Sequence, residues 1–259
     1  MLSNYKKAII TTILLAISNY SFASLEDCAK AGASHNDDKT ISECMEYANK
    51  NLEATSLIGL AYINKDDYKS SLPYLNWVIN YSNKNSQISN ADKKTISYSY
   101  AGAGNIYYFG QAGKADKTKG LEYITKAANL GYDFAQNQLG DFYASKESFP
   151  GRNLATAYKW YGLAVAQNYE PAKNGIFISN LSTITKQAPY CIGMGEQLVA
   201  QAYLDGTAGL SKDKSKAKKY LSQAIAIYKD NEPTKASYKY CAKQKGLDLA
   251  IAEKLLGSL

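Results

Sequence analysis

Small and aromatic residues recur at fixed places in two adjacent segments, and each segment has the apolar spacing of a helix pair. Gly104 and Gly140 hold corresponding places 36 residues apart, and Tyr107 and Tyr143 follow them by three residues. A small residue lets a second helix approach closely, and the aromatic residue fills the space beside it. This period predicts stacked helix-turn-helix repeats, which together bury the apolar faces that one repeat would expose.

The same pattern continues less regularly toward both ends of the chain. A degenerate helix pair is predicted around Gly59, and a third good pair carries Ala200 in the place of the packing glycine. Gly140 and Ala200 are 60 residues apart, which is longer than one period. We therefore interpret residues 173–192 as an irregular insertion, which can hold a half repeat and contains Pro189, a residue that disfavours helix interiors. Apolar residues at helical spacing predict one or two capping helices within residues 233–259. We find no alternating strand pattern, so the fold class is all-α.

The first 23 residues predict export from the cytoplasm. Two lysines precede the apolar run from Ala8 to Ile17, and a polar region then ends in Ala23. This order is typical of a secretory signal peptide. The apolar run is far shorter than the roughly 20 residues that span a bilayer, although a retained anchor is the alternative. We therefore expect residues 1–23 to be removed and residues 24–259 to form a single periplasmic or secreted solenoid without membrane insertion.

The chain has four cysteines, an even number that predicts disulfides in an oxidising compartment. Metal binding is the competing interpretation, but there is no C-x-x-C motif and His35 is the only histidine. We expect Cys28 to pair with Cys44 across a helical hairpin that turns near His35. Cys191 would then pair with Cys241 and tie the insertion to the C-terminal cap.

Charge gives little sign of a nucleic-acid partner. The net charge is +7 and falls to +5 once the leader, which carries two lysines and no acid, is removed. Nucleic-acid binders concentrate basic residues in runs or on one face. The densest basic cluster here alternates with small or acidic residues, as on the solvated edge of a helix; it comprises Lys212, Lys214, Lys216, Lys218 and Lys219.

The residue types also argue against an enzyme. Catalysis needs a nucleophile, a proton shuttle or a metal, and the only histidine lies in a turn-like polar stretch. No G-x-S-x-G elbow and no phosphate-binding loop is present. The segment AGAGNIYYFG departs from a dinucleotide loop because Tyr107 holds the place of its third glycine. We therefore expect no cofactor and no metal.

At the repeat positions the chain resembles the Sel-one-like repeat family, a relative of the tetratricopeptide repeat. The first repeat meets the family pattern at Gly104, Tyr107, Gly110, Asp116, Lys119, Tyr123, Lys126, Ala127, Ala128 and Gly131, and the second at Leu139, Gly140, Tyr143, Ala157, Trp160, Tyr161 and Ala164. The resemblance implies a right-handed α-solenoid of stacked antiparallel helix pairs.

Some disulfide-rich relatives in this family have been linked to penicillin binding and hydrolysis, chemistry that in serine acyl enzymes uses Ser-x-x-Lys. This chain has Ser211 with Lys214 and Ser215 with Lys218. The Ser-Asp-Asn and Lys-Thr-Gly partners of such enzymes are absent. We interpret the serines as helix-capping residues and keep a β-lactam hydrolase as the least favoured alternative.

The resemblance implies a protein partner, because bacterial family members act as envelope regulators, host-contact proteins or immunity proteins that neutralise exported toxins. The 23 tyrosines, against six phenylalanines and two tryptophans, suit a wet protein interface or, alternatively, coat the core. We expect an interaction module, with an immunity or inhibitor protein for a periplasm-acting toxin effector as its favoured form. An envelope scaffold or signalling regulator is the alternative.

The resemblance also indicates where the partner binds. In tetratricopeptide-like stacks the first helix of each pair lines the concave surface, and residues beside the packing glycine point into it. We therefore expect a continuous, hydrogen-bonding face formed by Asn105, Tyr108, Asn137, Asp141, Gln197 and Gln201. An inert solvated face and a contact site on the insertion are the alternatives.

Overall fold

The computed structural model describes residues 24–145, 151–169, 188–235 and 237–259, and within these ranges it is helical without strands. The expected leader, residues 1–23, and residues 173–187 of the expected insertion lie outside the described residues. No helix in the described ranges has the length and apolar character needed to cross a membrane. The chain divides into two compact units, up to Val78 and from Ile79 onward. The domain boundaries expected from the sequence stay a prediction.

The first unit consists of short helices that begin at polar caps. In order, these are α2 (Leu25–Ala33), α3 (Asp37–Cys44), the 3-10 turn η1 (Met45–Tyr47), α4 (Leu52–Asn64) and the start of α5 (Tyr68–Lys84). Ser24 and Asp27 form a reciprocal capping box at α2. Asn36 and Asn51 accept backbone N–H groups at the starts of α3 and α4. These side chains satisfy donors that the first helical turns would leave unpaired.

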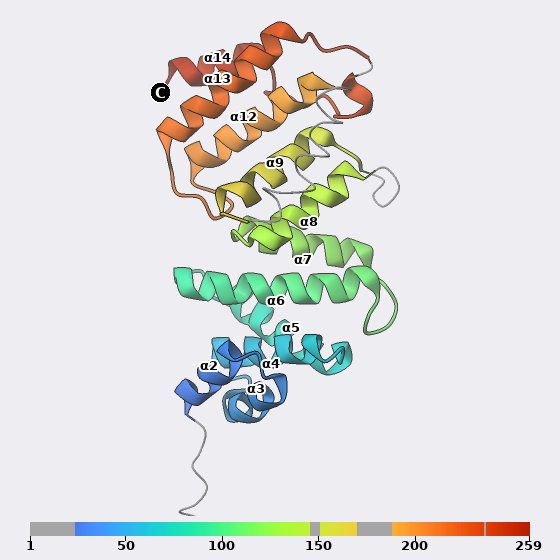
Figure 1. Ribbon diagram of the computed structural model, residues 1–259, viewed down its shortest axis with the longest axis vertical. Helices are drawn as coiled ribbons and strands as arrows, with labels where there is room; N and C mark the ends of the chain where they lie inside the picture. Colours follow the sequence, from blue (N-terminus) through green and yellow to red (C-terminus); the bar gives the residue numbers. More distant parts are fainter. Residues whose placement is uncertain (1–23, 146–150, 170–187, 236) are drawn as a thin grey trace, which may run out of the picture. The chain divides into compact units, whose positions relative to one another are not determined.

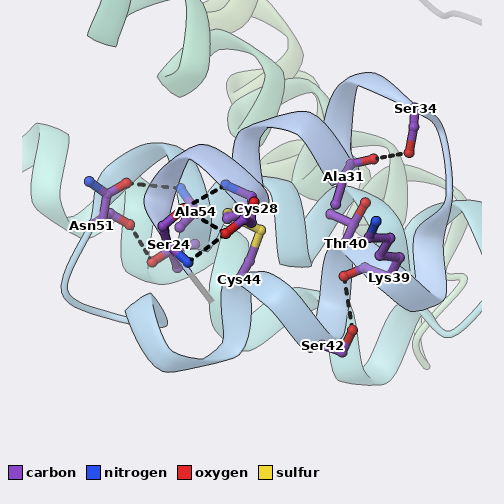
Figure 2. Close-up of a disulfide and its surroundings, with 12 residues drawn as sticks. Ser24, Cys28, Ala31, Ser34, Lys39, Thr40, Ser42, Cys44, Asn51 and Ala54 are labelled. Carbon is purple, nitrogen blue, oxygen red and sulfur yellow. Dashed lines mark hydrogen bonds between the residues drawn. A yellow bond between two sulfur atoms is a disulfide. The ribbon is translucent and has the colours of Figure 1, made fainter. Parts of the chain in front are cut away.

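A disulfide holds α2 against α3, as Figure 2 shows. Cys28 and Cys44 are both buried, and their α-carbons lie 4.7 Å apart. The turn between the two helices passes through His35, whose backbone is left-handed and whose side chain is exposed. The pairing predicted from the sequence is therefore the one that the structure contains.

The described residues of the second unit include three helix pairs followed by a short cap (Figure 1). The pairs are α6 (Asn90–Phe109) with α7 (Lys117–Asn129), α8 (Asp133–Ala144) with α9 (Leu154–Ala166), and α12 (Pro189–Asp205) with α13 (Lys214–Asp230). The cap contains the 3-10 turn η2 (Ser237–Lys239) and α14 (Leu249–Gly257). The predicted all-α solenoid of antiparallel helix pairs is confirmed.

The packing glycines lie where the repeat pattern places them. A β-carbon on Gly104 would lie 2.9 Å from Ile124 Cγ1, and one on Gly140 would lie 2.5 Å from the ring of Tyr161. Both distances are shorter than real β-carbon contacts. The first helix of each pair thus approaches the second at its glycine, and this confirms the register predicted from the sequence.

The third pair is stacked on the second through α12 and α9. These two helices are parallel, whereas the helices within each pair are antiparallel. Three contacts occur in the same order along α9 and α12 and beyond their ends: Tyr158 with Glu196, Gly162 with Val199, and Gln167 with Ala208. The chain therefore enters α12 at the same end of the stack at which it entered α9. As a result, the loop that follows α12 lies beside the end of α9.

The insertion expected over residues 173–192 extends too far toward the C-terminus, because α12 already begins at Pro189. A proline at the first helical position lacks only an N–H that would have no partner there, so it starts the helix rather than breaking it. Cys191 consequently lies on a repeat helix, where it bonds to Cys241 with 5.7 Å between the α-carbons. The predicted pair is present, but it ties α12, not the insertion, to the C-terminal cap.

Candidate functional site

The six residues expected on the partner-binding face differ in how far they are buried. Asn105 and Tyr108 lie on α6, Asn137 and Asp141 on α8, and Gln197 and Gln201 on α12. Asn105, Asp141 and Gln201 are half-buried. The other three are buried, with exposed fractions of 7% for Tyr108, 9% for Asn137 and 0% for Gln197. The prediction of one open face is therefore wrong for these three side chains.

Internal contacts explain why Tyr108 and Gln197 are not free to meet a partner. The ring of Tyr108 stacks on Phe142 with 4.7 Å between the centroids. Gln197 donates to the carbonyl of Gly246 at 2.8 Å and accepts from the Tyr228 hydroxyl at 2.9 Å. Tyr108 thus belongs to the core, and Gln197 holds the loop that precedes α14.

Of the four remaining predicted residues, all but Gln201 lie in two hydrogen-bonded groups. We call these groups together the amide network, which comprises Asn105, Gln138, Asn137, Asp141 and Tyr161. Gln138 Nε2 donates to Asn105 Oδ1 at 2.6 Å and joins α8 to α6. Asp141 accepts from Asn137 Nδ2 at 3.2 Å and from the Tyr161 hydroxyl at 2.7 Å. The sequence reasoning missed Gln138 and Tyr161. Gln138, one helical turn before Asp141, could have been found from helical spacing alone.

The amide network has more acceptors than donors. Asn137 Oδ1 and Gln138 Oε1 are shielded from solvent and have no hydrogen-bond donor among the described residues. Burial raises the pKa of Asp141, and the hydrogen bond from Tyr161 offsets this in part. A buried acceptor without a donor costs about 1–3 kcal/mol. The two shielded oxygens are out of a partner's reach, so another molecule can donate only to the half-buried members of the network with other oxygens, which are Asn105 and Asp141.

The Ser-x-x-Lys motifs have no catalytic arrangement in the described residues. Ser211 and Ser215 are exposed, and neither is hydrogen-bonded to its lysine. Asp213, not a serine, caps α13 by accepting the N–H of Lys216 at 2.9 Å. The interpretation of the serines as helix caps is therefore corrected. The described residues also hold no cluster of side chains suited to a metal ion.

A second feature of this unit is a groove of about 900 Å³, which we call the edge groove. One wall is the first half of α6, from Asn90 to Tyr98, and the other is the loop of residues 206–211. The turn between α7 and α8, residues 129–133, and Gln167 complete the lining. The parallel stacking of α12 on α9 brings this loop against the turn, so the groove follows from the placement of the third repeat.

The chain matches one family model and no curated protein. The model of the Sel1 repeat matches residues 97–132, 133–169 and 190–226. No curated protein matches the sequence.

Two solved structures are similar to the chain. A protective antigen of uropathogenic Escherichia coli with an SLR fold is 16% identical over 91% of this chain, with a TM-score of 0.39, and the chain spans 59% of its length. A Sel1 repeat protein from Oxalobacter formigenes is 17% identical over 89% of this chain and 96% of its own, with a TM-score of 0.45. The family match and the three helix pairs described above show that the chain carries three Sel1 repeats.

Proposed function

We propose that this chain is an exported protein-binding module and that its second unit binds a protein partner at the amide network. Sel1-repeat proteins generally mediate protein–protein interaction. The observation that carries the proposal is a pair of half-buried polar side chains on two adjacent repeats, Asn105 on α6 and Asp141 on α8, whose oxygens can accept further hydrogen bonds. A partner that donates to these side chains would add hydrogen bonds, which contribute about 0.5–3 kcal/mol each depending on charge.

Two observations support a place outside the cytoplasm. Both cysteine pairs are disulfide-bonded, and the described residues contain no free cysteine. Disulfides persist in oxidising compartments such as the periplasm and are rare in the cytosol. The signal-like N-terminus predicts the same compartment.

We further propose that the chain is an inhibitor or immunity protein that neutralises a periplasm-acting toxin effector. Such a protein binds one partner tightly in a fixed ratio. An envelope scaffold or signalling regulator would instead bind several envelope proteins more weakly. The stoichiometry and the number of captured partners distinguish these two forms.

The test is affinity capture from envelope and secreted fractions with the tagged chain, followed by measurement of the affinity for each captured protein. Asn105→Ala with Asp141→Ala removes two accessible members of the network, and we expect binding to weaken by about 2 kcal/mol or more. The matched control is Gln223→Ala with Asp230→Ala, which removes an exposed amide and an exposed acid from α13. Circular dichroism verifies that both variants keep their helices. Equal affinities for the two variants would contradict the proposed site.

A further inference from the structure

The wall of the edge groove formed by α6 carries two lysines without a carboxylate partner. Lys93 and Lys94 are both exposed, and neither takes part in an ion pair among the described residues. Lys93 Nζ lies 3.4 Å from Asn90 Oδ1, and Lys94 Nζ lies 5.9 Å from the centroid of the Tyr98 ring. These polar and aromatic contacts leave both positive charges available to an anion.

The opposite wall adds backbone donors. The loop turns through left-handed conformations at Gly206, Ala208 and Gly209. In the described structure, the N–H groups of the exposed residues Gly209 and Ser211 make no backbone hydrogen bond. Unpaired N–H groups in a turn favour negatively charged oxygens. The two walls therefore favour the same kind of ligand atom.

Aromatic side chains give the groove an apolar part as well. Tyr98 and Tyr132 both line it and meet edge to face with 4.8 Å between their centroids. Phe134 follows at 5.9 Å from Tyr132 and is 43% exposed. Burial raises the pKa of Tyr132 to about 12, so this ring stays uncharged at neutral pH. An aliphatic or aromatic side chain of a ligand can pack on these rings.

Asp133 is the single acid in the lining and does not cancel the two lysines. Its carboxylate accepts the N–H of Phe134 at 2.7 Å in the first turn of α8, a place where helix dipoles favour negative charge. The lining therefore keeps a net positive charge. Its volume of about 900 Å³ is large enough for a short segment of chain and exceeds what a single anion would fill.

We propose that the edge groove binds an acidic, extended segment of a partner protein. Carboxylates of the segment pair with Lys93 and Lys94, and an apolar side chain of the same segment packs on Tyr98 and Tyr132. This is a second binding surface, made of residues that the amide network does not use. The proposal goes beyond the proposed function, and it stands or falls on different residues.

The test is selection of peptides from an unbiased displayed library on the full chain. We expect the enriched peptides to combine Asp or Glu with an aromatic or aliphatic residue. The enriched peptide is then synthesised, and its affinity is measured for the wild type and for Lys93→Gln with Lys94→Gln. We expect about five- to ten-fold weaker binding, since exposed ion pairs each contribute modestly.

The matched control is Lys243→Gln with Lys245→Gln, which removes the same charge from two exposed positions outside the groove. It should change the affinity by less than about two-fold, because distant exposed charges are screened by salt. Asn105→Ala with Asp141→Ala should leave peptide binding unchanged, which separates this surface from the amide network. Enrichment of basic or uncharged peptides, failure to enrich any peptide, or equal weakening by the control would overturn the proposal.

Discussion

Gly131 and Gly209 meet through their α-carbons. A β-carbon on Gly131 would lie 2.7 Å from the α-carbon of Gly209, and one on Gly209 would lie 2.5 Å from that of Gly131. Beside them, Gln136 Nε2 donates to the carbonyls of both Ala128 and Ala208, at 3.0 and 2.9 Å. This contact joins the loop of the third repeat to the turn between the first two, and it builds the edge groove.

Replacing Gly209 by alanine should destabilise the second unit through two effects. Its φ of +81° disfavours an L side chain, and the new β-carbon would overlap Gly131. Gly246→Ala is the control, because Gly246 has a φ of +85° but no atom within 4 Å of the added carbon. We expect Gly209→Ala to lower the free energy of unfolding by about 1–3 kcal/mol more than the control does. Equal losses in denaturant titrations would show that the glycines are not in contact.

Gly140→Leu should overpack the contact between α8 and α9. The added side chain would meet the ring of Tyr161, and strain of this kind costs about 1–3 kcal/mol. Gly257→Leu, also in a helix but with no atom within 4 Å of the added β-carbon, is the control and should change the melting temperature little. An unchanged melting temperature for Gly140→Leu would refute the repeat register.

The two disulfides should differ in their contribution to stability. The Cys191–Cys241 bond spans 50 residues, and the Cys28–Cys44 bond spans 16. Loop-closure entropy gives about 4 kcal/mol for the longer loop and about 3 kcal/mol for the shorter one. Paired Cys→Ser variants, compared by thermal denaturation, should therefore show the larger loss for Cys191 and Cys241. The reverse order would mean that loop length does not dominate.

Glu196 should make stability depend on pH. Its carboxylate accepts from the Tyr158 hydroxyl between α9 and α12, and its Oε2 has no partner in the described structure. Burial raises its pKa from 4.5 to about 7, although Tyr158 and Lys219 each lower it in part. Below about pH 4.5 the Glu196 carboxyl is protonated in both the folded and the unfolded chain. As the pH rises to about 7, the unfolded chain ionises first and stability falls; above 7 the loss is constant.

Glu196→Gln keeps the shape and stays neutral, so it should remove this dependence. Raising the pKa of Glu196 from 4.5 to about 7 corresponds to about 3 kcal/mol in the free energy of unfolding. We expect the variant to be more stable than the wild type at pH 8 and nearly equal to it at pH 4.5. The control is Glu232→Gln, which removes an exposed acid. If both variants followed the wild-type pH profile, Glu196 would not be the titrating group.

Local patterns in the sequence predicted much of this structure. The places of Gly104 and Gly140, the hairpin closed by Cys28 and Cys44, and the helices of the third repeat all depend on residues near one another in the chain. Such features follow from helical spacing and capping. Pro189 is an exception, because proline disrupts a helix interior but suits its first turn, where Pro189 lies.

The long-range features could not be predicted in this way. The burial of Gln197 depends on Gly246 and Tyr228, which lie in the C-terminal part of the chain. The contact of Gly131 with Gly209 depends on the direction in which α12 is stacked. Nothing in the repeat pattern specifies that direction, so the edge groove could not be predicted.

In the proposed function, a partner protein binds the second unit at α6 and α8. Hydrogen–deuterium exchange of the full chain, measured alone and with the partner captured by affinity, tests it most directly. We predict slower exchange in peptides that cover Tyr98–Phe109 and Asp133–Ala144, because binding at the amide network stabilises both helices. Protection confined to the first unit, Leu25–Val78, or absent from α6 and α8, would contradict the claim.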